Sequence, residues 1–269
     1  MDLHLHPPAR SRSAATKPVP SFPQLSPAPV FDYHPSVDGI DTNLLILFHG
    51  LGDTQIPFGQ LGRKLNLPQT ACMSIRAFGR VPFLEEEAYQ WWESFDITGS
   101  LLTNPNPSST LTKLMAMLDR LASEELGWKP EDIHLFGFAQ GGSCLSELAL
   151  LWNRSQSTSA SSLASIVSVS GPLLSLPTIP TSSRSPTPVL LWSRRGEDDT
   201  GKWRTGFERG FQSVQHFLGP RASHEQMPMT PQEWKPILEF WSKLLKSRHP
   251  WELNDGDTEA TSTYEVRTG

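Results

Sequence analysis

A six-residue segment, Gly-Phe-Ala-Gln-Gly-Gly at positions 137–142, constrains the fold of this chain more than any other feature. It follows a short apolar run at 133–136 and precedes a run at 143–152 with helical character. Its glycines allow a strand and a helix to approach closely across a strained turn. In the pattern Gly-x-Ser-x-Gly such a turn presents a nucleophilic serine. Here the central residue is Ala139, whose methyl group cannot attack a carbonyl carbon.

A second glycine-containing loop, His-Gly-Leu-Gly-Asp-Thr at 49–54, directly follows an apolar run at 43–48. The continuous run predicts a strand buried on both faces of a parallel sheet. The loop then lies at the carboxyl edge of the sheet, where open α/β sheets bind ligands and where backbone N–H groups can form an oxyanion hole. A glycine turn without chemistry is the alternative, and for His49 alone we favour a structural role in that turn.

Alternation of strand-like and helix-like segments predicts the fold class. Strand, helix, strand order along the whole chain is typical of an α/β protein with right-handed crossovers. We expect a doubly wound, mostly parallel sheet with helices on both faces. The expected strands are 30–33 at an edge, 43–48, 71–75, 133–136, 163–170, 188–192 and 213–217, and the expected helices are 58–65, 111–121, 143–152, 203–210 and 231–245.

Composition indicates one globular domain between two polar tails. A chain of 269 residues can bury one large core, but its content of 37% hydrophobic and 19% charged residues is low for a fully globular protein. Residues 1–28 are rich in Pro and Ser, and residues 248–269 are polar. We therefore expect a disordered tail at 1–28, an α/β domain at 29–247 and a second disordered tail at 248–269.

Charge and cysteine content exclude several function classes. The formal net charge of −5 and a pI near 5.9 come without a basic stripe, which argues against a nucleic-acid partner. Two cysteines, Cys72 and Cys144, do not form a disulfide framework, so we expect a reducing compartment. The first residues do not resemble a signal peptide, and no apolar run is long enough for a transmembrane segment. These features predict a cytoplasmic protein, and nothing in the pattern indicates a metal ion or cofactor.

The stretch at 76–97 is irregular and holds four aromatic residues, Tyr89, Trp91, Trp92 and Phe95. Aromatic side chains in a loop near the carboxyl edge can line an acyl pocket, so Trp91 and Trp92 are candidate substrate-binding residues. A satellite core under a long loop explains the same cluster equally well.

Three positions fall at the carboxyl ends of successive expected strands. They are Ala139, then Asp199 or Asp198, and then His224. Serine hydrolases need a histidine within reach of the nucleophile and a carboxylate that orients the imidazole. Singly, the aspartate can be a turn residue and the histidine a surface residue. Their order, nucleophile, acid, histidine, favours a catalytic arrangement.

These motifs together resemble the phospholipase/carboxylesterase family, which includes the acyl-protein thioesterases and has an α/β-hydrolase fold. The resemblance rests on the loop at 49–54 and the turn at 137–142. Residues 92–97 look like the family's Trp-Phe-Asp-Ile segment, and 168–171 look like its Ser-Gly turn. Residues 196–199 are similar to its Gly-x-x-Asp-Pro acid loop, although Thr200 replaces the proline. The similarity spans about residues 40–245.

The resemblance implies roles for particular residues. Asp199 would be the acid and His224 the base, while Leu51 and Gln140 would be the backbone donors of the oxyanion hole. The substrate would be a small-molecule ester or an acylated protein. The chain departs from the family at Ala139, where the family has its serine, and after the histidine, where Glu225 and Gln226 replace small residues.

Two hypotheses follow from the missing serine. In the first, the chain is a carboxylic-ester or thioester hydrolase that has lost its nucleophile and most of its activity. In the second, it is a non-catalytic module that binds an acyl group, a lipid or an acylated partner. Ser143 is a poor substitute because it lies about 6 Å further along the helix axis. Cys144 faces another direction and fits a small core residue better.

Overall fold

A seven-stranded sheet in the order β10-β9-β8-β7-β3-β4-β2 forms the centre of the computed structural model, which describes residues 4–5, 16–156, 162–194, 197–222, 224–248 and 266–267. All neighbouring strands are parallel except β2, which pairs antiparallel with β4 at one edge. The strands are β2 (Phe31–His34), β3 (Asn43–Phe48), β4 (Thr70–Ile75), β7 (Ile133–Phe138), β8 (Ser165–Val169), β9 (Val189–Ser193) and β10 (Val214–Leu218). Two short antiparallel pairs lie outside this sheet, β5 (Gly79–Arg80) with β6 (Tyr89–Gln90), and β1 (His4–Leu5) with β11 (Val266–Arg267).

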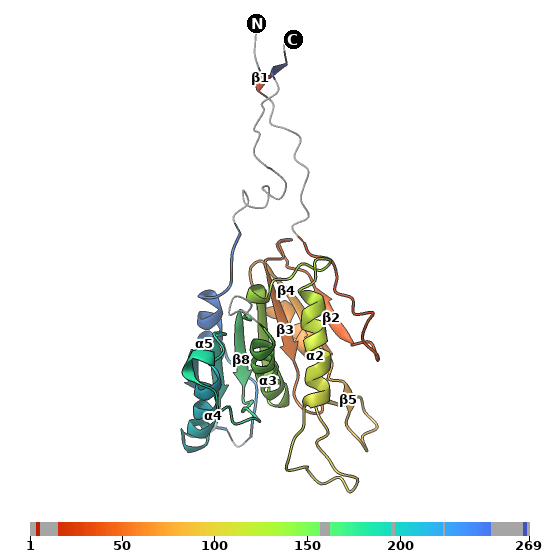
Figure 1. The fold of residues 1–269 in the computed structure, drawn as a ribbon, viewed down its shortest axis with the longest axis vertical. Coiled ribbons are helices and arrows are strands. Elements are labelled where there is room, and N and C mark those ends of the chain that lie inside the picture. Colours follow the sequence, from red (N-terminus) through yellow and green to blue (C-terminus); the bar gives the residue numbers. More distant parts are fainter. Residues whose placement is uncertain are drawn as a thin grey trace.

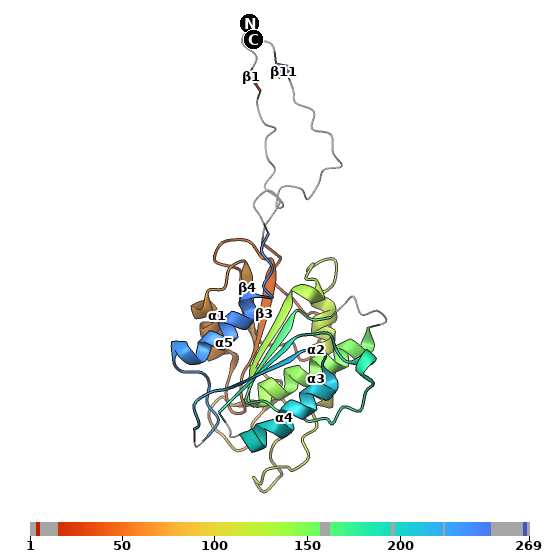
Figure 2. The same cartoon turned by 90° about the vertical axis from the view of Figure 1, so that its left-hand side faces the viewer.

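Helices cover both faces of the sheet, as Figures 1 and 2 show. One face carries α1 (Gln55–Leu65) and α5 (Pro231–Ser242), and the other carries α2 (Ser108–Leu121), α3 (Gln140–Ser155) and α4 (Glu197–Gly210). Short 3₁₀ turns occur at Pro130–Asp132 and Thr181–Ser183. The predicted doubly wound α/β architecture is therefore confirmed. Within the described chain, no helix has the length and apolar character needed to cross a membrane.

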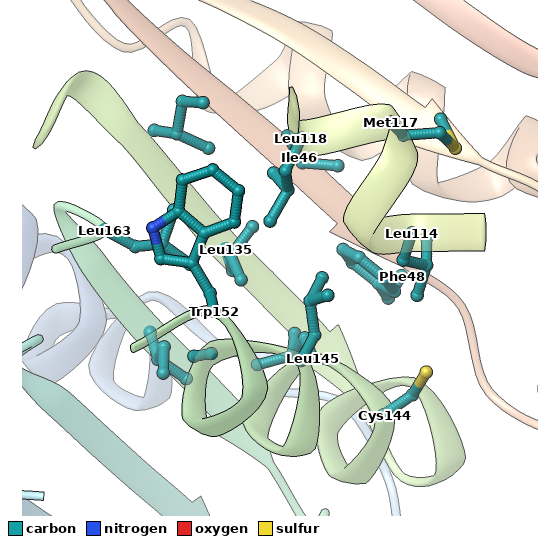
Figure 3. Close-up of a cluster of buried hydrophobic side chains, with 14 of the residues drawn as sticks. Ile46, Phe48, Leu114, Met117, Leu118, Leu135, Cys144, Leu145, Trp152 and Leu163 are labelled. Atoms are coloured by element: carbon teal, nitrogen blue, oxygen red, sulfur yellow. The ribbon is translucent and has the colours of Figure 1, made fainter. Parts of the chain in front are cut away.

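Alternate residues of β3 explain why its sequence is apolar throughout. Leu44, Ile46 and Phe48 belong to the cluster under α2 and α3, whereas Leu45 and Leu47 belong to the cluster under α1 and α5. A strand buried on both faces needs apolar side chains at every position. Figure 3 shows how side chains of α2 and α3 converge on the first of these faces, among them Leu114, Met117, Leu118, Cys144, Leu145 and Trp152.

The strand order reverses between β3 and β7, which is the position where open α/β sheets form a ligand-binding crevice. From β3 the sheet continues through β4 in one direction and through β7, β8, β9 and β10 in the other. The loops that follow β3 and β7 therefore leave the same carboxyl edge in opposite directions, and this is where open α/β sheets bind ligands. The two glycine-containing segments of the sequence meet here.

The N-terminal segment at 16–28 differs from the prediction of a disordered tail. The Phe22 side chain is only 5% exposed and packs edge-to-face on Phe31, with ring centroids 5.5 Å apart. The Lys17 backbone N–H donates to Asp41, and Lys17 Nζ donates to the Gly127 carbonyl at 2.6 Å. One buried aromatic ring and two polar anchors thus join this Pro- and Ser-rich segment to the domain. The rest of the predicted tails, residues 1–3, 6–15, 249–265 and 268–269, lies outside the described residues.

Helix α4 begins earlier than the expected helix at 203–210. Its first residue is Glu197, so the stretch that was expected to form an acid loop is the first turn of the helix. Most other elements agree with the expected ranges to within three residues at each end, and α3 extends the expected 143–152 to Gln140–Ser155.

Candidate active site

Ala139 occupies a strained turn between β7 and α3. Its backbone angles, φ 48° and ψ −115°, lie outside the regions that residues with a Cβ normally adopt. The conformation is held by two backbone hydrogen bonds, from the Ala139 N–H to the Val169 carbonyl at 2.8 Å and from the Ser143 N–H to the Ala139 carbonyl at 3.0 Å. Strain of this kind persists only where the surroundings enforce it. The turn thus keeps the shape that presents a nucleophile, although Ala139 carries no reactive atom.

Two glycines let the surrounding backbone segments approach this turn. A Cβ at Gly141 would lie 2.6 Å from the Phe48 carbonyl oxygen, and a Cβ at Gly171 would lie 2.5 Å from the Ser143 nitrogen. No side chain fits at either distance, since the obstacle is backbone in both cases. Glycine is therefore required at these two positions, because α3, β3 and the loop after β8 contact each other through their backbones.

The predicted oxyanion-hole donors lie on the two sides of the crevice. Gln140 is the first residue of α3, and Leu51 lies in the turn after β3 with 39% of its surface exposed. Among the described backbone hydrogen bonds of turns and loops, the Leu51 N–H has no protein acceptor. Gln140 lies in the first turn of α3, where backbone N–H groups have no acceptor within the helix and the helix adds a partial positive charge. Binding of an oxygen atom by these two groups stays a prediction.

The Gln140 side chain braces the site in a way that the sequence did not indicate. It is buried, its Oε1 accepts from the Trp91 N–H at 2.8 Å, and its Nε2 donates to Ser94 Oγ at 2.8 Å. Trp91 Nε1 in turn donates to the His49 carbonyl at 2.8 Å, and Thr110 Oγ1 donates to the Trp91 carbonyl. The segment at 91–94 is thus bonded both to the turn after β7 and to the end of β3.

The loop that carries Leu51 has its own brace. The Gly52 N–H donates to the Tyr89 carbonyl at 2.9 Å, and the Tyr89 N–H donates to the Asp53 carbonyl at 3.2 Å. Gly52 has a φ of 84°, which favours glycine at this position. The aromatic stretch after β4 therefore fixes the relative position of both donor segments, and no local sequence signal pointed to Tyr89, Ser94 or Thr110 for this role.

His49 has the structural role that the sequence favoured. Its ring is fully buried, Nδ1 lies 2.7 Å from the Gly50 carbonyl, and Nε2 accepts from the Ala77 N–H at 3.0 Å. Because Nε2 is an acceptor, Nδ1 carries the proton and the ring is neutral. Burial lowers the pKa of His49, which keeps it neutral. His49 joins the end of β3 to the end of β4.

The two tryptophans proposed for substrate binding occupy different environments. Trp91 has no exposed surface, and its ring packs on Phe48 with centroids 4.8 Å apart. This position corresponds to the satellite-core alternative. Trp92 is half-buried and lines a cavity of about 370 Å³, to whose wall Trp91 also contributes together with Phe78, Leu102 and Lys113. Contact of either ring with a substrate stays a prediction.

The predicted acid and base are placed by different elements. Asp198 and Asp199 lie in the first turn of α4, and their side chains fall outside the described residues. His224 is exposed in the loop between β10 and α5, where the Gln226 side-chain Nε2 lies 2.6 Å from His224 Nε2. In a serine hydrolase, this imidazole nitrogen takes the proton of the nucleophile. In the present chain Gln226 contacts this nitrogen of His224, and the role of His224 as a base stays a prediction.

A parallel sheet that reverses its order at this crevice, with a strained turn into α3 and a glycine-containing loop after β3, defines an α/β-hydrolase. The chain belongs to the phospholipase/carboxylesterase family, whose model matches residues 36–247. This confirms the resemblance drawn from the two glycine motifs. No group of three potential metal ligands occurs among the described His, Cys, Asp and Glu residues.

A curated relative agrees with this membership, and a solved structure agrees with the fold. The chain is 38% identical over 243 residues to an uncharacterized hydrolase of Mycosarcoma maydis, covering 88% of this chain and 90% of the relative. It is 27% identical over 209 residues to an uncharacterized hydrolase of Schizosaccharomyces pombe, covering 76% and 83%. The crystal structure of acyl-protein thioesterase 2 from Zea mays has the same fold, with a TM-score of 0.61, 18% identity and coverage of 81% of this chain and 99% of that chain.

Proposed function

We propose that this chain has lost most or all of the ester and thioester hydrolysis of its family while it keeps the framework of the site. The observation that carries the proposal is Ala139 at the strained turn between β7 and α3. In a serine hydrolase, loss of the nucleophile lowers kcat by about 10⁶, and the oxyanion hole and binding leave roughly 10³–10⁴ over the uncatalysed rate. The chain would therefore accelerate hydrolysis by no more than roughly 10³–10⁴ over the uncatalysed rate.

Neighbouring nucleophiles do not replace the missing serine. Ser143 is only 3% exposed, and its backbone N–H is bonded to the Ala139 carbonyl in the helix. Cys144 is fully buried, and burial raises the pKa of its thiol, which disfavours the reactive thiolate. Neither side chain is placed to attack an acyl group held by Leu51 and Gln140.

A second candidate function is binding of an acyl ester or an acylated protein without turnover. The preserved groups favour it, because the backbone N–H groups of Leu51 and Gln140 can still bind a carbonyl oxygen, and the Gln140 brace still positions them. Binding beside Trp92 should change tryptophan fluorescence. A titration with acyl esters of several chain lengths that gives no change at any length would contradict this candidate.

The substitution Ala139→Ser tests the main proposal. The turn already has the backbone geometry, so the added hydroxyl should raise the hydrolysis of short p-nitrophenyl esters by orders of magnitude. A fluorophosphonate probe should label position 139 in the variant and no serine in the unsubstituted chain. Ala139→Gly is the matched control, because it relaxes the backbone without adding a hydroxyl, and it should remain inactive.

Two results would contradict this proposal. Stoichiometric labelling of any serine in the unsubstituted chain would show a working nucleophile elsewhere. A folded Ala139→Ser variant without turnover would show that the acid or the base is absent as well, and the binding function would then be favoured. Because Gln226 contacts His224 Nε2, the second variant Ala139→Ser/Gln226→Ala should hydrolyse faster than the first.

A further inference from the structure

Arg194 follows β9 directly and places its guanidinium group under the loop that joins β10 to α5. Only 6% of its side chain is exposed, and Nη1 lies 2.6 Å from Glu233 Oε1, which is 7% exposed. Nη1 also donates to the Pro220 carbonyl at 3.3 Å, and Nη2 donates to the Met227 carbonyl at 3.1 Å. The guanidinium carbon lies 5.0 Å from the centre of the Trp192 ring. A single buried side chain thus bridges a strand, a loop and a helix.

The two carbonyl groups that Arg194 binds belong to residues on either side of His224 in the sequence. Pro220 precedes the histidine by four residues, and Met227 follows it by three. The loop is also fixed at both ends, where the Gly219 N–H donates to the Ser193 carbonyl at 2.8 Å and the Met229 N–H donates to Glu233 Oε2 at 2.7 Å. Arg194 therefore joins the two sides of the loop that contains His224.

Stability alone is a weak reason for this buried ion pair. Desolvation of two charges cancels much of their attraction, and well-packed apolar residues often stabilise a fold equally well. A guanidinium group offers something that apolar residues and lysine do not, a rigid planar fork that binds several acceptors in fixed directions. Here that fork binds two carbonyl groups on opposite sides of the same loop together with one carboxylate.

We infer that Arg194 is a positioning residue that fixes the loop of His224 and thereby the place of the imidazole at the carboxyl edge of the sheet. The inference rests on the proposed function, because the role of His224 as the base belongs to that proposal. Arg194 itself acts through the loop and is not expected to touch a substrate.

Hydrogen exchange in the unsubstituted background tests the structural part of this inference without any need for activity. Arg194→Lys keeps a positive charge for Glu233 but cannot bind both carbonyl groups, and it should increase exchange at residues 219–229 by about tenfold or more. Lys246→Met is the control, because it breaks the 2.5 Å pair with Asp132 at the opposite edge of the sheet. It should leave exchange at 219–229 unchanged. Equal exchange in Arg194→Lys and the unsubstituted chain would overturn the inference.

Kinetics in the Ala139→Ser background test the catalytic part. Displacement of a catalytic group by about 1 Å can cost about 10²-fold, so Arg194→Lys should lower kcat by about that factor while KM stays within about twofold. A merely structural role predicts a lower melting temperature with unchanged kcat, and that result would overturn the inference. If Ala139→Ser has no activity, the proposed function fails, and the exchange experiment still decides whether Arg194 holds the loop.

Discussion

The Gln140 side-chain carbonyl accepts a hydrogen bond of 2.8 Å from the Trp91 backbone N–H, 49 residues away in the sequence. The same residue is the first residue of α3 and directly follows Ala139. One side chain therefore links the strained turn at Ala139 to the aromatic segment that braces the loop of Leu51. The turn at Ala139 and the loop of Leu51 are thus joined by one framework of hydrogen bonds.

This link predicts the effect of Gln140→Leu. The substitution keeps the backbone N–H but leaves the Trp91 N–H without its acceptor in a buried place, so the free energy of unfolding should fall by about 1–3 kcal/mol. Urea denaturation measures the change. Gln60→Leu on the exposed face of α1 is the matched control and should change stability by no more than about 0.5 kcal/mol. Equal effects of the two substitutions would mean that the Gln140 brace does not stabilise the fold.

A second prediction identifies the acid. In the Ala139→Ser background, His224→Ala should abolish the gained esterase activity, and Asp199→Asn should lower kcat by a large factor, about 10⁴ in the best-studied triad. Asp198→Asn is the control and should keep the activity. Ester hydrolysis by purified variants of equal melting temperature measures these effects. The reverse result for the two aspartates would assign the acid to Asp198.

The elements that sequence could predict are those with local causes. The apolar run of β3 and the glycines around Ala139 follow from burial on two faces and from backbone contact, and both leave a pattern within a few neighbouring residues. The start of α4 at Glu197 was missed because an acidic first turn reads equally well as a loop. Local patterns therefore gave the architecture and the central turn, but not every boundary.

The brace around the site could not be predicted because its partners lie far apart in the chain. Ser94 and Gln140 are separated by 46 residues, and Trp91 and His49 by 42. Nothing in the spacing of a serine or a tryptophan specifies a partner at such a distance. The carbonyl groups of Pro220 and Met227 are equally invisible in sequence, since every residue has a carbonyl group and only the fold selects these two for Arg194.

A third prediction concerns Phe22. Its ring is buried in the core cluster that α2 and α3 also build, so Phe22→Ala should lower the free energy of unfolding by about 3 kcal/mol. Val19→Ala is the control in the same segment. Val19 is 67% exposed, so this substitution should change the free energy of unfolding by no more than about 0.5 kcal/mol. Thermal or urea unfolding distinguishes the two. If Phe22→Ala is as mild as Val19→Ala, the segment does not contribute to the core in solution.

A fourth prediction follows from Glu233. The hydrogen bond from Arg194 is the largest influence on its carboxylate and, with bonds from the Met229 and Thr230 N–H groups, lowers its pKa from 4.5 to about 2 against the opposing effect of burial. A carboxyl group with a lowered pKa in the folded state stabilises the protein above its unfolded pKa, and the stabilisation is lost as the pH falls from about 4.5 towards 2.

Urea unfolding between pH 5.5 and 3.5 measures this effect. As the pH falls, the free energy of unfolding should decrease more for the unsubstituted chain than for Glu233→Gln. The difference in free energy of unfolding between the two proteins should therefore become smaller at lower pH. Glu239→Gln is the control on the same helix, because the Glu239 carboxylate pairs with Lys235 at 3.7 Å on the exposed surface. A constant difference between the unsubstituted chain and Glu233→Gln across this range would contradict the prediction.

The docking of residues 16–28 has a consequence for the order in which the molecule assembles. Lys17 bonds to Gly127 across 110 residues, and Ser21 accepts from Arg120 across 99. The segment is synthesised before these partners, which become available only after α2 has emerged from the ribosome. Closing loops of about 100 residues carries a higher entropic cost than forming local contacts, so we expect these contacts to be absent from the folding transition state. Contacts of that kind slow unfolding more than they speed folding, and we therefore expect the docked segment to prolong the lifetime of the native state.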